Sequence, residues 1–165
     1  MKSEFEKAFS EAESRSFPPF LPTAQESTPF NSTPYVTNIA AIKAGAALAD
    51  RAELMERFVE TVEGLPDIAI RPVFALLGGS AIGPKIDPND LDCVVFYEAI
   101  EGFNAGAIPD FQKLSRLRRI DLRLIPWDTD PILAAKALSY FSTLYVKNRN
   151  ELNIVRGLVI VDVRQ

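Results

Sequence analysis

Three aspartates lie in or beside segments that are otherwise typical of buried strands. Asp90 and Asp92 flank the start of an apolar run over residues 91–97, and their spacing of two points both carboxylates to the same side of a strand. Asp121 stands near the start of a second β-prone run, residues 120–125. An unpaired charge in an apolar strand is costly, so a cation is the simplest remedy. Three converging carboxylates suit one or two magnesium ions that hold a triphosphate.

A glycine-rich turn precedes these aspartates. Residues 70–77 predict a buried strand that ends at Gly78, Gly79 and Ser80, where backbone N–H groups can face an anion. Lys85, in the loop that follows, can supply a cation. The ordinary alternative is a tight turn made by the two glycines, and the first aspartate is equally suited to a turn or cap position.

The order of these features resembles the signature of the nucleotidyltransferase superfamily, which has the polymerase-β-like fold. That order is Gly-Gly-Ser, nine intervening residues, Asp-Leu-Asp and a later strand aspartate, and the resemblance covers roughly residues 70–126. More narrowly, residues 88–92, the proline-rich lead-in over 17–34 and the closing run 156–160 resemble a small bacterial nucleotidyltransferase-like family of unknown function. The chain departs from the better-known minimal members at Ile82, where a basic residue is usual, and at Asn89, where a serine is usual.

The resemblance implies a fold, an activity and a set of site residues. The fold is α+β (α/β), a mixed sheet of about four or five strands flanked by helices, with an extended proline-rich N-terminal arm. The activity is transfer of a nucleoside monophosphate from a nucleoside triphosphate to a hydroxyl of a protein, RNA end or small molecule, with Mg²⁺ or Mn²⁺. Metal binding and catalysis fall to Asp90, Asp92 and Asp121, the last also activating the attacking hydroxyl. Phosphate binding falls to Gly78, Gly79, Ser80, Lys85, Arg149 and Arg156, although the last two are also suited to be ordinary surface charges.

Composition narrows the alternatives. The chain has 165 residues and a net charge of −4, which favours one domain and argues against a protein that coats nucleic acid. Residues 113–119 nevertheless form a basic run beside Asp121. This run has two alternative interpretations, a patch that attracts phosphate groups or the solvated face of a helix. The absence of histidine excludes Ser-His and Cys-His catalysis and histidine-ligated zinc. Cys93, the single cysteine, is expected to pack in the core.

The same features indicate where the protein resides and what it meets. No intramolecular disulfide is possible with one cysteine, and neither a signal peptide nor a run of about 18 apolar residues is visible, so we expect a cytoplasmic protein with no membrane partner. The N-terminal arm, residues 17–34, contains five prolines and several aromatics. We expect Phe17, Phe20 or Phe30 to pack against the same chain, a second copy or a partner protein.

Periodicity and capping residues predict the remaining elements. Asp130 followed by Pro131 predicts the start of a helix that continues to Val146. In that helix the residues expected to face inward are Ile132, Leu133, Ala137, Tyr140, Phe141 and Leu144. The other predicted elements are helices over 3–13, 37–49, 51–63 and 111–118, a loop over 98–110, and a strand over 157–163. The predicted division of the chain is an N-terminal helix and arm over residues 1–36 and a nucleotidyltransferase-like domain over residues 37–165.

Three functions remain open at this level. The first is the metal-dependent nucleotidyltransferase. The second is a catalytically inactive binding or regulatory module of antitoxin type, and the third is a nucleotide or nucleic-acid sensor that binds without transfer. Trp127 adds a further ambiguity, since it is suited either to stack on a base at the cleft rim or to pack half-buried in the core.

Overall fold

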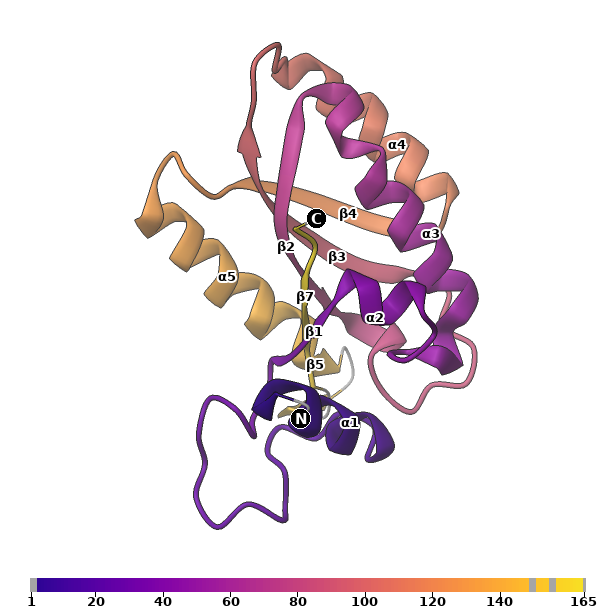
Figure 1. Ribbon diagram of the computed structural model, residues 1–165, viewed down its shortest axis with the longest axis vertical. Coiled ribbons are helices and arrows are strands. Elements are labelled where there is room, and N and C mark those ends of the chain that lie inside the picture. The colour runs from indigo at the N-terminus through magenta and orange to yellow at the C-terminus, as the bar shows by residue number, and fades with distance from the viewer. Residues whose placement is uncertain (1–2, 149–150, 155–156, 165) are drawn as a thin grey trace.

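The computed structural model describes residues 3–148, 151–154 and 157–164. Its centre is an open mixed sheet of five strands in the order β1-β7-β2-β3-β4 (Figure 1). β1 pairs parallel with β7 and β3 parallel with β4, whereas β2 is antiparallel to both of its neighbours. The expected mixed sheet of about four or five strands is therefore confirmed. The strands are β1 (Tyr35–Asn38), β2 (Ile70–Gly78), β3 (Leu91–Ala99), β4 (Ile120–Pro126) and β7 (Val159–Asp162).

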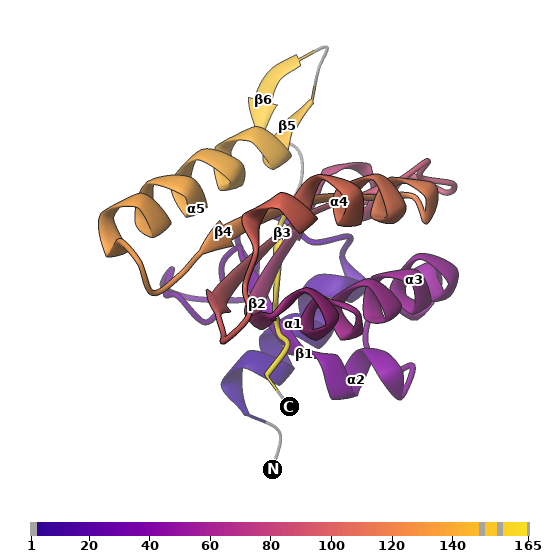
Figure 2. The ribbon, with the colours of Figure 1, turned by 90° about the horizontal axis from the view of Figure 1, so that it is seen from above.

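Helices cover both faces of this sheet (Figures 1 and 2). Residues of α1 (Glu4–Ser14), α2 (Ile39–Lys43), α3 (Ala52–Glu63) and α4 (Ile108–Leu117) belong to or pack against one apolar core that includes alternate side chains of all five strands. The other face packs against α5 (Pro131–Val146). Short 3₁₀ turns are η1 (Ala49–Arg51), η2 (Leu65–Ile68), η3 (Gly79–Ala81) and η4 (Ala105–Ala107), and a separate hairpin pairs β5 (Lys147–Asn148) with β6 (Glu151–Ile154).

Local sequence accounts for the strongest elements. The nine-residue strands β2 and β3 form antiparallel neighbours, and their apolar side chains alternate between the two cores. α3 buries the stripe predicted for it: Leu54, Phe58, Val62 and the following Leu65. A capping box between Ser3 and Glu6 begins α1. Among the described residues no helix combines the length and apolar composition needed to cross a bilayer.

The predicted helix over residues 37–49 is wrong at both ends, because the helix that forms there, α2, covers only Ile39–Lys43. Thr37 lies in β1, and Asn38, not Thr37, caps the short helix α2 by accepting a hydrogen bond from the Ala41 N–H at 2.9 Å. β1 exists because Tyr35 pairs with Val159, more than a hundred residues later. A four-residue strand with such a distant partner leaves no local signal that competes with the helical pattern after it.

α5 begins where the sequence predicts but faces differently. The Asp130 carboxylate accepts hydrogen bonds from the N–H groups of Ile132 and Leu133, at 2.9 and 3.2 Å, which confirms the predicted cap. Four of the six residues expected to face inward are exposed: Ile132, Leu133, Tyr140 and Leu144. The helix is apolar on nearly every side, so periodicity alone does not choose a face. The buried face is instead made by Ala134, Ala137, Tyr145 and Val146.

The irregular segment over residues 15–34 packs against its own chain. Phe17 is buried, and its ring lies 5.6 Å from that of Phe9 and 6.2 Å from that of Tyr35. Phe30 is partly exposed but lies 5.0 Å from the ring of Phe5, whereas Phe20 is exposed. The expectation that at least one of these phenylalanines packs is confirmed, and the surface belongs to the same chain.

Candidate functional site

Asp92 and Asp121 lie opposite each other on the parallel strands β3 and β4. Alternation along β3 places Asp92 on the same face as Val94 and Phe96, whose side chains pack in the α5 core. Asp121 alternates in the same way with Leu122, which belongs to the opposite core, so both carboxylates project from the α5 face. Neighbouring strands are separated by about 4.8 Å, and two like charges are therefore held close together. This shared face agrees with the sequence expectation, and metal binding stays a prediction.

Asp90 lies just before β3 and is exposed. It lines a cavity of about 290 Å³ whose walls also include Asp121 and Ile120, together with the three arginines Arg116, Arg119 and Arg123. Within the described ranges, no group of three or more His, Cys, Asp or Glu side chains is placed so as to hold a metal ion. The structure thus joins Asp121 to Asp92 across the sheet and to Asp90 across the cavity.

Gly79 and Asp92 form one structural unit. Gly79 has a φ of +68°, and a Cβ on it would stand 1.8 Å from Oδ2 of Asp92. A side chain there would therefore collide with the carboxylate, in a backbone conformation that already favours glycine. The Gly-Gly-Ser turn and the Asp-Leu-Asp segment are linked because the carboxylate occupies the space that Gly79 leaves open.

Gly78 serves a different purpose. It is the pairing partner of Asp92 in the β2–β3 ladder and has extended backbone. A Cβ at Gly78 would lie 2.5 Å from Cβ of Tyr145 and 2.9 Å from Cδ2 of Leu158. Gly78 thus allows α5 and the chain before β7 to approach β2, which is a packing role. Ser80 follows in η3 and is half-buried.

Arg51 organises the loop between the glycine turn and Asp90. Its Nε donates to the Ala81 carbonyl at 3.1 Å and its Nη2 to the Gly83 carbonyl at 3.1 Å. Further bonds join its guanidinium to the carbonyls of Lys85 and Ile86. Lys85 itself is exposed and is not part of the cavity wall. No sequence signal marked Arg51, because it stands at the start of a helix with no motif around it.

The basic run over residues 113–119 divides in three dimensions. Arg116 and Arg119 line the cavity with Asp90 and Asp121. Lys113 instead pairs with Asp110 at 3.3 Å, and Arg118 pairs with Glu60 of α3 at 4.0 Å. The basic run was considered as a phosphate-attracting patch of four cations, and two of the four, Arg116 and Arg119, flank the site.

The cavity arginines differ in how they are held. Arg119 Nε and Nη2 donate to the carbonyls of Asn89 and Pro88, both at 2.6 Å, so Arg119 fixes the chain that leads into Asp90. Arg116 Nε lies 3.9 Å and Arg123 Nη2 lies 3.6 Å from the same atom, Oδ1 of Asp121. Arg123, on β4, thus belongs to the cavity wall although it lies outside the basic run over residues 113–119.

The paired carboxylates affect two neighbouring groups. Burial, reinforced by the charges of Asp92 and Asp121, raises the pKa of the Cys93 thiol well above its usual range. Cys93 is fully buried, which confirms the predicted core position. Burial also raises the pKa of Tyr145, with smaller contributions from Cys93 and the same two aspartates and a partial offset by Arg123. Both groups therefore stay protonated near neutral pH.

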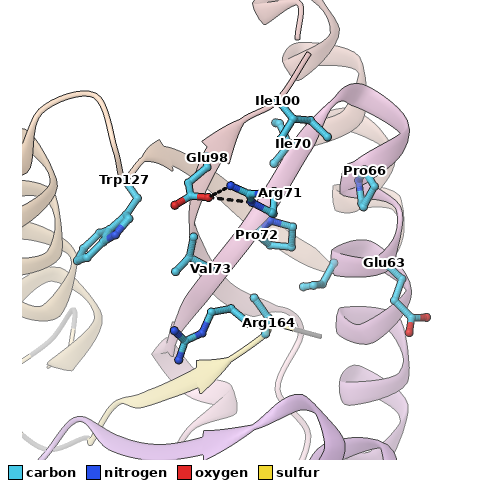
Figure 3. A pocket seen from close by; sticks show the side chains of 12 residues that line it. Glu63, Pro66, Ile70, Arg71, Pro72, Val73, Glu98, Ile100, Trp127 and Arg164 are labelled. Atoms are coloured by element: carbon cyan, nitrogen blue, oxygen red, sulfur yellow. Dashed lines mark hydrogen bonds and ion pairs between the residues drawn. The ribbon is translucent and has the colours of Figure 1, made fainter. Parts of the chain in front are cut away.

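A larger cavity of about 890 Å³ lies at the other end of the β2–β3 pair (Figure 3). Figure 3 shows Arg71 facing Glu98, to which its Nε donates at 2.8 Å, and Trp127 on the far side of Glu98. The remaining walls are mostly apolar, with Val62, Pro66, Ile70, Val73, Ile100 and Val163 among them.

Trp127 belongs to this larger cavity and not to the acidic one. Its backbone N–H donates to the Tyr97 carbonyl at 2.7 Å, and Tyr97 lies five residues after Asp92, a separation of about 16 Å along the strand. The Trp127 ring instead contacts Phe74 at a centroid distance of 5.0 Å. Of the two alternatives for Trp127, packing against the sheet is its observed environment, away from the carboxylate site.

Two candidate phosphate contacts, Arg149 and Arg156, lie outside the described residues. Among known proteins, the model of a family of unknown function (DUF6932) matches residues 30–162. The match spans most of the chain and includes both glycines and all three aspartates of the site. No curated protein and no solved structure shows a significant match.

Proposed function

The chain belongs to the DUF6932 family of unknown function, and we propose that it transfers a nucleoside monophosphate from a nucleoside triphosphate to a hydroxyl acceptor. The observation that carries the proposal is the pairing of Asp92 with Asp121 on one sheet face, directly against the Gly79 turn. Two carboxylates on neighbouring strands repel each other, and the glycine beside them admits no side chain. This arrangement lowers the stability of the fold, so stability does not explain it. Such concentrated cost is typical of functional sites.

The residues present fit a divalent cation. Mg²⁺ prefers oxygen ligands and is commonly bound through one or two carboxylates, with the other positions left to water and substrate phosphates. Asp92 and Asp121 supply two carboxylates on one face, and Asp90 is a third candidate. A bound Mg²⁺ or Mn²⁺ would neutralise phosphate charge during transfer.

The proposed reaction is an in-line displacement at the α-phosphorus. The acceptor oxygen forms a bond to this phosphorus, the bond to the bridging oxygen breaks, and pyrophosphate leaves. The hydroxyl proton passes to the carboxylate of Asp121. The turn at Gly79 and Ser80 orients the phosphates through its backbone N–H groups, and the cavity arginines add positive charge where pyrophosphate forms.

A second candidate function is a binding module of the same architecture that no longer transfers. The observation that favours it is the position of Arg116 and Arg123, both within 4 Å of Asp121, where they occupy one of the acids needed for chemistry. In that case the nucleotide would bind and remain intact.

The test uses α-³²P-labelled nucleoside triphosphates with Mg²⁺ or Mn²⁺ and measures both label transfer and pyrophosphate release. Pyrophosphate release reports transfer even when the acceptor is unknown, and pooled RNA and the protein itself serve as first acceptors. Asp92→Asn should abolish both signals, while Asp110→Asn, an exposed carboxylate paired with Lys113, should preserve them. Nucleotide binding without release supports the second candidate. Absence of binding to every triphosphate contradicts both.

A further inference from the structure

We propose that Arg116 and Arg123 are the polyphosphate-binding pair of this cavity and that Asp121 holds them in place until the anion arrives. The inference rests on the proposed function for the identity of the anion, a triphosphate chain. It goes further by naming the side chains that bind it and the group that the anion must displace.

The first step is that Arg116 and Arg123 are only loosely held. Both approach the same oxygen of Asp121, at 3.9 and 3.6 Å, which are ion-pair separations and longer than hydrogen bonds. Each guanidinium carries five N–H donors in a planar fork that matches phosphate oxygens. Their side chains are 58% and 45% exposed, so an anion can reach them from solvent.

The second step is the charge of the cavity. Its wall contains three arginines and two aspartates, an excess of one positive charge. Arg119 is committed to the carbonyls of Pro88 and Asn89, which leaves Arg116 and Arg123 as the pair able to change partners. A volume of about 290 Å³ offers room for a compact anion between them.

The third step separates a compact anion from a nucleic-acid strand. A strand needs a continuous basic track, because affinity for it grows with each neutralised phosphate. Here Lys113 and Arg118 pair with Asp110 and Glu60 outside the cavity, and the whole chain carries a net charge of −4. The basic run over residues 113–119 therefore forms no continuous track, and its two cavity arginines favour a compact polyphosphate group.

The fourth step concerns Asp121, which has two opposed effects on an anion. It orients both arginines, but its own charge repels the anion and competes for the same guanidinium groups. Without a divalent cation, removing that charge should therefore strengthen anion binding. The same change should weaken nucleotidyl transfer, since the proposed function needs the carboxylate.

The experiment titrates inorganic tripolyphosphate into the full chain by calorimetry, in a chelating buffer without divalent cations. Arg116→Gln and Arg123→Gln should each lower the affinity at least fivefold, and Asp121→Asn should raise it at least threefold. Arg118→Gln is the matched control, because it removes the same charge from the same run but faces α3, and it should change the affinity less than twofold. Circular dichroism and thermal melting identify any variant that fails to fold, and Arg123→Lys, which keeps the charge without the fork, provides a milder substitute with an intermediate loss.

Several results would overturn the proposal. Equal affinities for Arg123→Gln, Arg118→Gln and the unchanged chain would do so, as would the absence of tripolyphosphate binding. Equal losses for Arg118→Gln and Arg116→Gln would indicate a diffuse basic surface of the kind that nucleic acid uses. Weaker binding by Asp121→Asn would show that orientation of the arginines by the carboxylate outweighs its competition with the anion, against the proposed displacement. The proposed function is tested separately by label transfer. Anion binding without label transfer would support the role of Arg116 and Arg123 and contradict the proposed enzyme activity.

Discussion

The two ends of the β2–β3 pair differ in their charge, packing and backbone geometry. At the glycine–carboxylate end, defined by Gly78, Gly79, Asp92 and the adjacent Asp121, half-buried charges lie against backbone that only glycine tolerates. At the outer end, defined by Ile70–Pro72 and Glu98–Ile100, apolar side chains surround a cavity about three times larger, and the charged pair Arg71–Glu98 faces solvent.

The difference shows that cavity size is a poor guide to chemistry in this molecule. A large apolar cavity is favourable for binding apolar surface but offers few groups that polarise a bond. The smaller cavity concentrates carboxylates and guanidinium groups, which suit phosphate chemistry. The predictions below test whether the two ends differ in this way.

The largest effect is expected from Gly79→Ala. A Cβ there meets the Asp92 carboxylate at 1.8 Å and adopts a positive φ, so we expect a loss of about 2–5 kcal/mol in the free energy of unfolding, from backbone strain and overpacking together. Gly45→Ala is the matched control, since Gly45 has the same φ of +68° but nothing within 4 Å of its Cβ position. It should lose about 1–2 kcal/mol from strain alone.

Urea unfolding of both alanine variants, and of Gly79→Ala combined with Asp92→Ala, measures this contrast. The double variant should recover part of the loss, because the colliding carboxylate is gone. If Gly45→Ala and Gly79→Ala lose the same free energy, the close contact between the turn and Asp92 is not what makes this end unusual.

The next effect is expected from Asp92→Asn. Replacing one of two neighbouring carboxylates should weaken Mg²⁺-dependent nucleotide binding at least tenfold, while the melting temperature in metal-free buffer stays the same or rises because repulsion from Asp121 is reduced. Glu98→Gln removes an acid from the outer end and should leave nucleotide binding unchanged. Calorimetry and thermal melting measure both quantities, and a large metal-free loss of stability in Asp92→Asn would indicate a structural ion pair.

A smaller effect concerns alkaline pH. The folded-state pKa of Tyr145 is raised by burial and by the nearby negative charges, so its contribution to stability is complete below the unfolded pKa of about 10 and is lost as pH rises beyond it. Tyr145→Phe should therefore show a shallower fall in melting temperature between pH 9 and pH 11, a window set by that pKa of about 10. Tyr140→Phe, on the exposed side of the same helix, should fall as steeply as the unchanged chain. Identical slopes for the two variants would contradict the burial of the Tyr145 hydroxyl.

The smallest effect is expected at the outer end. The Arg71 side chain is 65% exposed, and exposed ion pairs contribute about 0–1 kcal/mol, so Arg71→Gln should change the free energy of unfolding by less than about 1 kcal/mol. It should not change tripolyphosphate affinity. A loss of anion binding in Arg71→Gln would move the phosphate site to the larger cavity and reverse the comparison between the two ends.

The sequence predicted those parts of the molecule that rest on local patterns. Alternation placed Asp92 on one side of a strand, and the Asp130 cap marked the start of α5 within one turn. Such signals depend on residues only a few positions apart, so they survive without knowledge of the fold.

The tertiary structure decided which of these parts meet. β1 forms because Tyr35 pairs with Val159, and Gly79 lies against Asp92 because the turn after β2 folds back over β3. Arg118 lies outside the cavity, where it forms an ion pair with Glu60 of α3. The buried face of α5 is set by the close approach of Tyr145 to Gly78, which cannot be predicted from helical periodicity. These contacts join segments far apart in the chain, and their free energy becomes available only when the whole core is assembled.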